Sequence, residues 1–148
     1  MPLLNYTTKI PWERSYTEVK SLLIAHGARG FYEEVGPEGY INSFIFKLRT
    51  PDGDVPIKIP IDVESTIKIL KKQYDSGEID RRFTDPKRAR NIAWRIIKDW
   101  LQAHIWLVET EMMKMEQILL PYMMVDKDHT LYEAMKDRHF LLGEGREK

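Results

Sequence analysis

The chain has 148 residues, of which 43% are hydrophobic and 31% are charged. This is the composition of an ordinary globular domain and not of a disordered segment. Lys and Arg number 23, as do Asp and Glu, so the net charge alone indicates no polyanionic partner. The sequence has no cysteine, no recognisable signal peptide and no apolar run near the roughly 20 residues of a membrane span. We therefore expect a cytoplasmic protein that does not contact a membrane.

The N-terminal half of the sequence predicts a strand, a helix and three further strands. Apolar residues alternate over residues 3–10, which is typical of a strand, and helical spacing then runs from Pro11 to a stop at Gly27. Three more strands are predicted at residues 28–35, 40–49 and 55–61, separated by the turn sequences GPEG and PDGD.

Two of these strands have predictable positions in a sheet. The strand at residues 40–49 is apolar on both faces, which favours an interior position. The strand at residues 55–61 contains Pro56 and Pro60, which lack an N–H donor, so it belongs at a sheet edge.

The C-terminal half predicts helices. Asp62 is a suitable N-cap for one helix, and Asp85-Pro86 opens the longest, which the pattern extends to about residue 120. A short last helix is predicted over residues 130–142 and a disordered tail over residues 143–148. The predicted fold is a single α+β domain, residues 1–142. It has a four-stranded, mainly antiparallel sheet (β-α-β-β-β-α), followed by the long helix and the short last helix.

The long helix carries an apolar seam with 3,4 spacing and two polar interruptions. Such a heptad pattern is typical of helices that pair with another helix, and a helix of this length is about 50 Å long. The alternatives are packing within the same chain and homo-oligomerisation. The predicted oligomer seam consists of Trp94, Ile97, Leu101, His104, Val108, Glu111, Met115 and Ile118.

The first half of the same helix has a basic face. Lys87, Arg88, Arg95 and Lys98 fall within an arc of about 100° on the helix. The wider region, residues 63–98, carries 10 basic and 5 acidic groups. An exposed arginine and lysine stripe with an aromatic residue can bind phosphates and stack a base. The alternative is a solvated helix face. The predicted nucleic-acid-binding residues are Arg81, Arg82, Lys87, Arg88, Arg95, Lys98 and Trp106.

Other clusters predict packing rather than chemistry. Five methionines between Met112 and Met124 suit an adaptable core or interface. Asp126, Asp128 and His129 suit a turn better than a metal site. The sequence has no P-loop, no dinucleotide-binding glycine motif, no HExxH and no cysteine nucleophile. It therefore predicts no enzyme, no cofactor and no metal.

Four segments resemble a family of small uncharacterised proteins encoded by bacteriophages and other mobile elements. They are LNYTTKI (residues 4–10), AWRIIKDW (93–100), LLPYM (119–123) and LYE (131–133). The resemblance implies expression inside a host cell and transfers no activity to any residue.

The sequence favours a non-enzymatic, oligomeric accessory protein that binds DNA or RNA non-specifically through the basic helix face. One alternative is a protein-interaction module that blocks a host defence or transcription protein, through the methionine-rich end or the edge strand. Another is a sponge for a small ligand held between two copies.

Overall fold

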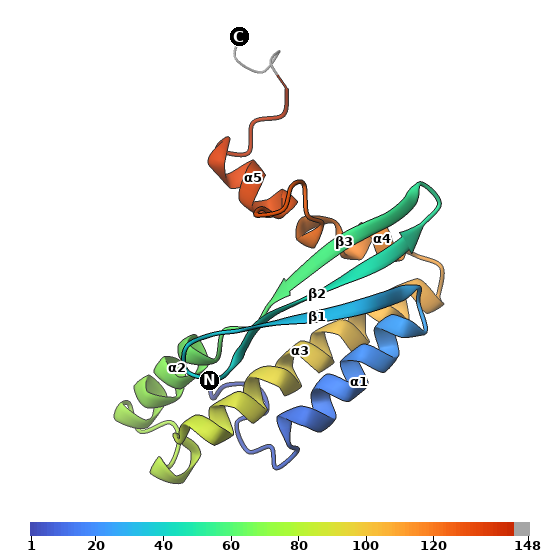
Figure 1. Cartoon of the computed structure of the whole chain (residues 1–148). Helices are drawn as coiled ribbons and strands as arrows, with labels where there is room; N and C mark the ends of the chain where they lie inside the picture. The colour runs from blue at the N-terminus through green and yellow to red at the C-terminus, as the bar shows by residue number, and fades with distance from the viewer. Residues whose placement is uncertain (144–148) are drawn as a thin grey trace.

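The computed structural model describes residues 1–143 and contains a three-stranded antiparallel sheet with two long helices on one face (Figure 1). No helix in this part of the chain is both long and apolar enough to cross a bilayer. In chain order the elements are α1 (Trp12–Ile24), β1 (Ala28–Val35), β2 (Ile41–Thr50), β3 (Gly53–Pro60), α2 (Val63–Asp75), the 3₁₀ turn η1 (Arg81–Phe83), α3 (Pro86–Glu109), α4 (Met115–Ile118), the 3₁₀ turn η2 (Leu120–Tyr122) and α5 (Leu131–Asp137).

The sheet confirms the α+β class but has three strands in the order β1-β2-β3 instead of the predicted four. Strand β2 is central, as its two apolar faces predict, and β3 lies beside β2 alone. Pro56 and Pro60 lack an N–H donor, but β3 has no second neighbouring strand that would need one, so the sheet loses no hydrogen bond.

The predicted first strand, residues 3–10, is wrong. Asn5 has a φ of 63° and a turn surrounds it, with Tyr6 N–H donating to Leu3 O over 3.1 Å. Leu3 N–H donates to Gln73 Oε1 at 3.0 Å, and Asn5 Nδ2 donates to Asp99 at 2.8 Å. This segment thus bonds to α2 and α3 and not to the sheet, and Leu4 is exposed to solvent.

Helices α1 and α3 run parallel across the sheet. The N–H of Trp12 donates to Asn91 Oδ1 over 2.9 Å near the start of both helices. At the other end, His26 Nε2 lies 2.8 Å from Glu109 Oε1. Both helix N-termini therefore point to the same end of the molecule, which is the lower end in Figure 1.

The core lies between these two helices and one face of the sheet. Trp94 on α3 is fully buried, and its ring centroid is 4.6 Å from that of Tyr16 on α1 and 5.8 Å from that of Phe44 on β2. Alternate residues of β2 and β3 face this cluster, because successive side chains of a strand point to opposite faces. The inward residues of the two strands are Phe44, Phe46, Leu48, Ile57 and Ile59.

Helix α3 ends at Glu109, so the predicted continuous helix to about residue 120 is wrong. Thr110 Oγ1 donates to Trp106 O at 2.9 Å, and Glu111 adopts a left-handed φ of 61°. The N–H groups of Met112 and Met113 then both donate to Leu107 O. This closes the helix in the way a glycine usually does, although no glycine is present.

The chain after α4 turns back to the edge of the sheet and forms a C-terminal arm, residues 120–143. Met123 pairs with Ile57 of β3, and Met124 pairs with Thr130 to bring the chain into α5. The last helix covers Leu131–Asp137, which is shorter than the predicted 130–142. Of the predicted disordered tail, Gly143 adopts a φ of 73° and residues 144–148 lie outside the described residues.

Candidate nucleic-acid interface

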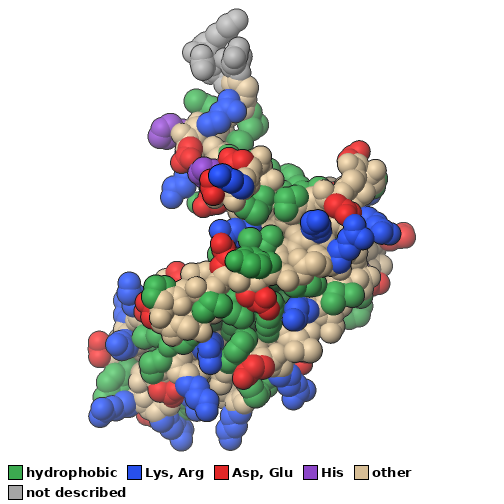
Figure 2. Space-filling model, in the orientation of Figure 1, with side chains coloured by type: hydrophobic (Ala, Val, Ile, Leu, Met, Phe, Trp, Pro, Cys, Tyr) green, Lys and Arg blue, Asp and Glu red, His purple; other side chains and the backbone are tan. Residues whose placement is uncertain are grey.

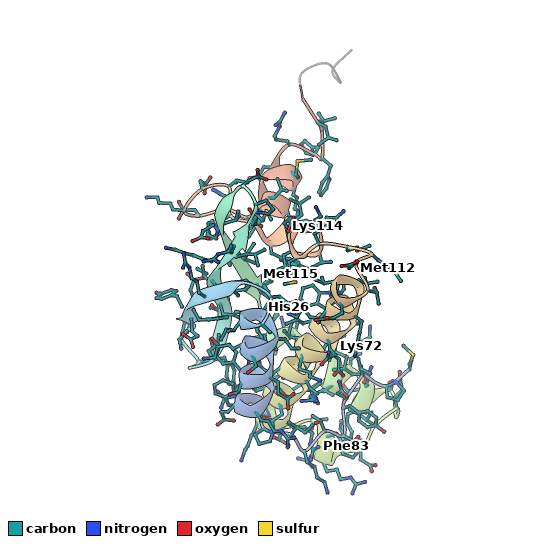
Figure 3. The ribbon with its side chains drawn as sticks, turned by 90° about the vertical axis from the view of Figure 1, so that its right-hand side faces the viewer. His26, Lys72, Phe83, Met112, Lys114 and Met115 are labelled. Carbon is teal, nitrogen blue, oxygen red and sulfur yellow. The ribbon has the colours of Figure 1, made fainter. Side chains whose placement is uncertain are left out.

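The end of the molecule to which α1 and α3 point their N-termini is built from four chain segments. These are the N-terminal turn, the end of α2, η1 and the start of α3. Tyr6 packs edge-on against Phe83, with 5.2 Å between ring centroids, and Phe83 lies at this end in Figure 3. Gln73 near the end of α2 donates to Met1 O at 3.0 Å. The first contact holds η1 against the N-terminal turn, and the second holds that turn against α2. We call this region the basic end.

Helix α3 begins here as the sequence predicts. Asp85 is the N-cap and accepts a hydrogen bond from Arg88 N–H at 2.9 Å, and Pro86 occupies the first helical position. The dipoles of α1 and α3 add partial positive charge to the same end, although Asn91 and Asp85 each accept a hydrogen bond from one of the first N–H groups.

Three of the predicted phosphate-binding residues are exposed at the basic end, namely Arg81, Arg82 and Lys87. Arg82 lies 4.7 Å from the centre of the Phe83 ring, and its Nε is 3.6 Å from Asp80 in a highly exposed pair that adds little stability. Figure 2 shows Lys and Arg side chains gathering along this lower edge. The three cations are therefore free to contact phosphates.

Two other predicted residues, Arg88 and Arg95, are held within the fold. Arg88 donates to Thr8 O at 3.2 Å and lies 5.0 Å from the centre of the Phe83 ring. Arg95 forms an ion pair with Glu18 of α1 at 2.8 Å, and its side chain is only 15% exposed. These arginines fasten the N-terminal segment and α1 to α3.

The electrostatics of Glu18 agree with this structural role for Arg95. Partial burial by itself would raise the pKa of the Glu18 carboxyl. The hydrogen bond and charge of Arg95, with contributions from Arg14 and Lys98, nevertheless hold that pKa below its usual value.

Lys98 and Trp106 lie further along α3, away from the basic end. Lys98 lines an open groove of about 430 Å³ between α1 and α3, together with Gln102 and Arg95. Trp106 is 62% exposed, but 19 residues of helix place it about 28 Å from Lys87 along the axis. It cannot stack on a base whose phosphates Arg81 and Lys87 hold.

Two further cations lie near the basic end and are not among the residues predicted from the sequence. Lys9 is exposed and follows Thr8, whose carbonyl binds Arg88. Arg90 lies 4.6 Å from the centre of the Trp12 ring and 5.4 Å from that of Tyr40. Lys9 lies in a segment expected to form a strand, and Arg90 lies outside the basic arc, so no pattern in the sequence joins them to η1.

The predicted oligomer seam is largely used inside the chain. Trp94 and Leu101 are fully buried in the core, and Ile97 and Val108 pack against it. His104 stays within its own helix, where Nδ1 donates to Trp100 O at 2.8 Å.

The remaining seam residues follow the end of α3. Glu111 is exposed in the turn after the helix, while Met115 and Ile118 are buried in α4. Because the chain turns at Glu111, these residues do not continue the α3 stripe.

The loop before α5 is a capped turn. Asp126 Oδ1 accepts hydrogen bonds from the N–H groups of Asp128 and His129 at 2.7 and 2.8 Å. Within residues 1–143, no three His, Asp or Glu side chains are grouped closely enough to hold a metal ion.

No family model, curated protein or solved structure matches the chain. The resemblance to proteins of phages and mobile elements therefore stays a prediction.

Proposed function

We propose that the basic end binds nucleic acid without sequence preference, through the phosphate groups, as part of a non-enzymatic accessory protein. The surface consists of Arg81, Arg82 and Lys87, with Lys9 beside them. It is smaller than the stripe expected from the sequence, because Arg88 and Arg95 hold other parts of the fold.

The observation that carries this proposal is the exposure of three cations at the end where two helix N-termini converge. Of the nearby carboxylates, Asp85 is occupied as the N-cap of α3, and Glu78 binds the terminal amine of Met1 at 2.9 Å. Asp80 lies 3.6 Å from Arg82 in an exposed pair and offsets one of these positive charges. The local excess of positive charge thus faces solvent, where it attracts a polyanion.

Fluorescence anisotropy with labelled duplex DNA, duplex RNA and single strands tests the proposal. If about three phosphates are neutralised on duplex DNA, the affinity should fall about 40-fold between roughly 50 and 200 mM salt. The triple variant Arg81→Ala, Arg82→Ala, Lys87→Ala should lose most of the binding and most of this salt dependence, without a change in melting temperature.

The matched control removes three exposed cations from elsewhere, Lys47, Arg49 and Lys114. It has the same change in net charge and should bind nearly as well as the unchanged protein. Equal losses in both triple variants would mean that binding follows net charge and not the basic end. No binding to any probe at the lower salt concentration would remove the proposal.

A second candidate function, contact with another protein, has one specific observation in its favour. Met112 is 71% exposed at the opposite end of α3, and Trp106 is exposed on the last turns of the same helix. Met112 also lies at this end in Figure 3. Exposed methionine and tryptophan side chains are common at adaptable protein interfaces.

Light scattering and pull-down experiments address this candidate. A second copy as partner should give a mass above the 17.6 kDa of the chain, and the double variant Trp106→Ala, Met112→Ala should return the mass to that value. A different protein should be retained by the unchanged chain and lost with the double variant. A monomer that retains no partner would argue against both forms of the idea.

A further inference from the structure

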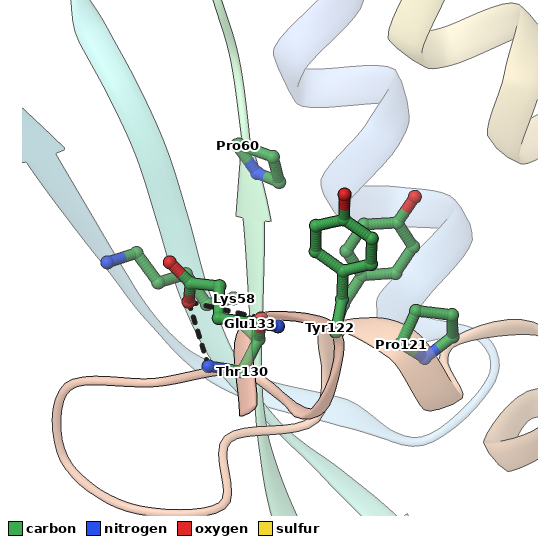
Figure 4. Close-up of a pocket in the computed structure, with 7 residues that line it drawn as sticks. Lys58, Pro60, Pro121, Tyr122, Thr130 and Glu133 are labelled. Atoms are coloured by element: carbon green, nitrogen blue, oxygen red, sulfur yellow. Dashed lines mark hydrogen bonds between the residues drawn. The ribbon is translucent and has the colours of Figure 1, made fainter. Parts of the chain in front are cut away.

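A pocket of about 400 Å³ lies where the C-terminal arm meets the edge of the sheet. Residues of β3, of η2 and of the first turn of α5 line it, so it exists only because the arm folds back onto β3 (Figure 4). This volume lies in the range of small-molecule sites. The pocket is remote from the basic end and independent of the function proposed above.

The walls of the pocket are mostly flat apolar groups. Pro60 comes from β3, Pro121 and Tyr122 from η2, and Tyr132 from α5. Tyr122 is held in place by an edge-on contact with Trp100, with 5.7 Å between ring centroids. Tyrosine rings present a negative face that attracts cations.

The carboxylate of Glu133 contributes negative charge to this wall. Backbone and side-chain hydrogen bonds from Thr130 help to lower the pKa of Glu133 below its usual value, although burial opposes them, so the group is ionised at neutral pH. Both bonds from Thr130, at 2.9 and 3.1 Å, end on Oε1. Among residues 1–143, no hydrogen bond ends on Oε2.

Lys58 is the one basic residue in the lining, and its charge also helps to lower the pKa of Glu133. Its Nζ lies 3.0 Å from Glu34 Oε1. Because Glu34 is on β1, on the other side of β2 from β3, the ammonium leans across β2. Ser43 Oγ also donates a hydrogen bond to the Glu34 carboxylate, and this bond helps to hold the carboxylate next to Lys58. Lys58 thus serves two carboxylates, those of Glu34 and Glu133, with a single positive charge, so this group of three side chains keeps a net negative charge.

The N–H groups at the start of α5 offer little to an anion. Thr130 N–H is used by Glu133 Oε1, and Glu133 N–H donates to Thr130 Oγ1 at 3.3 Å. This reciprocal capping box uses two of the donors at the start of α5. Negative ligands thus meet a carboxylate at this cap, with two of its donors already occupied.

We propose that this pocket binds an organic cation whose charge sits on a flat or alkylated group, such as a guanidinium or a substituted ammonium. The tyrosine rings and prolines would contact its apolar part, and Glu133 Oε2 would accept its N–H donors. The same chemistry occurs in a free amine and in the arginine side chain of a protein segment.

Titration of ¹⁵N-labelled protein, followed by two-dimensional NMR, tests the proposal. The probes are agmatine, the peptide acetyl-Pro-Arg-Pro-amide and its citrulline counterpart, which has nearly the same shape without the charge. Saturable shifts should occur at Tyr122, Thr130 and Tyr132. The citrulline peptide should bind roughly tenfold more weakly or worse, since a hydrogen bond to a charged group is lost. Agmatine binding as tightly as the arginine peptide would indicate a free amine, and tighter peptide binding would indicate a protein segment.

Two variants remove the proposed contacts without removing the arm. Glu133→Gln keeps a side chain that can serve the capping box but loses the charge, and Tyr132→Ala removes a half-exposed ring. Each should weaken binding of the arginine peptide about tenfold. The control Asp137→Asn removes a carboxylate from the same helix outside the pocket lining and should change the affinity by less than about twofold.

Three results would each overturn the proposal. They are the absence of saturable shifts, equal affinity for the arginine and citrulline peptides, and an unchanged affinity in Glu133→Gln. A loss in Asp137→Asn as large as in Glu133→Gln would do the same, because it would show general attraction to an acidic helix instead of binding in the pocket.

Discussion

The basic end and the C-terminal arm differ in how each region uses its charged side chains. At the basic end, Arg88 and Arg95 are consumed by contacts with Thr8 and Glu18, and the surplus of cations faces solvent. In the arm, the main charged groups serve local turns: Asp126 caps a loop, and Glu133 caps α5. The exposed excess is therefore positive at the basic end, whereas in the arm the carboxylate of Glu133 lines a pocket together with two tyrosines.

This difference shows why a chain of zero net charge can still carry two electrostatically distinct surfaces. The two regions are also held differently. Four segments meet at the basic end, whereas the arm contacts the sheet edge through the pairing of Met123 with Ile57. We call the sheet with helices α1–α3 the body of the molecule. We expect mutations in the body and in the arm to have separate effects, and the following predictions test this.

The largest expected effect comes from Trp94→Ala in the body. The ring is fully buried against Tyr16, Phe44 and Trp12, so its removal should lower the free energy of unfolding by about 3–5 kcal/mol. Chemical denaturation followed by circular dichroism measures this. A loss below about 1 kcal/mol would mean that the core is not organised around Trp94.

Arg95, which is paired within the fold, should affect stability, whereas the exposed Lys87 should affect binding. Arg95→Ala removes the partner of Glu18 Oε2, while Arg14 still contacts Oε1, and should destabilise the fold by about 1–2 kcal/mol. Lys87→Ala should change stability by less than about 0.5 kcal/mol and weaken nucleic-acid binding. Thermal unfolding and anisotropy on both variants measure this, and the reverse result would contradict the assignment of the two roles.

The capping box of α5 should matter to the arm alone. Thr130→Ala removes the cap and should weaken α5 locally by about 1 kcal/mol. Hydrogen exchange should become faster at residues 131–137, with little change in the amides of β2 and α3. Thr17→Ala on the exposed side of α1 serves as control. Equally faster exchange in β2 would show that the arm and body unfold together.

The smallest effect is a titration in the arm. The hydrogen bond that His129 Nδ1 donates to the Asp126 carboxylate raises the pKa of His129 above its usual value, and the negative charge of Asp126 raises it further. The stabilisation is then complete below the ordinary histidine pKa and is lost as the pH rises through the raised one. NMR titration should show the raised pKa, and Asp126→Asn should return it towards 6.5, the usual value. An equal pKa in both proteins would contradict this pairing.

Most local features could be predicted from particular residues. Asp62 and Asp85-Pro86 begin helices α2 and α3 because their side chains satisfy free N–H groups, whatever surrounds them. The double-faced apolar pattern of β2 and the prolines of β3 predicted their order in the sheet, because burial and missing donors constrain position directly.

The secondary structure predicted from the sequence was wrong where one residue pattern is compatible with two structures. Residues 3–10 alternate like a strand but lie on α2 and α3, since a half-buried irregular segment has the same pattern. The helical spacing continues past Glu109 in the sequence, while Thr110 and Glu111 end the helix without the glycine that usually marks such a turn.

The sequence by itself thus determined the secondary structure of the sheet hairpins, the helix starts and the approximate location of positive charge. Only the tertiary structure decided which cations stay free and that Pro60, Tyr122 and Glu133 line one pocket. The physical reason is that capping and alternation act between near neighbours in the chain. The partners of Arg95 and the walls of the pocket come from segments about 70 or more residues apart, as with Glu18 and Arg95 or Pro60 and Glu133.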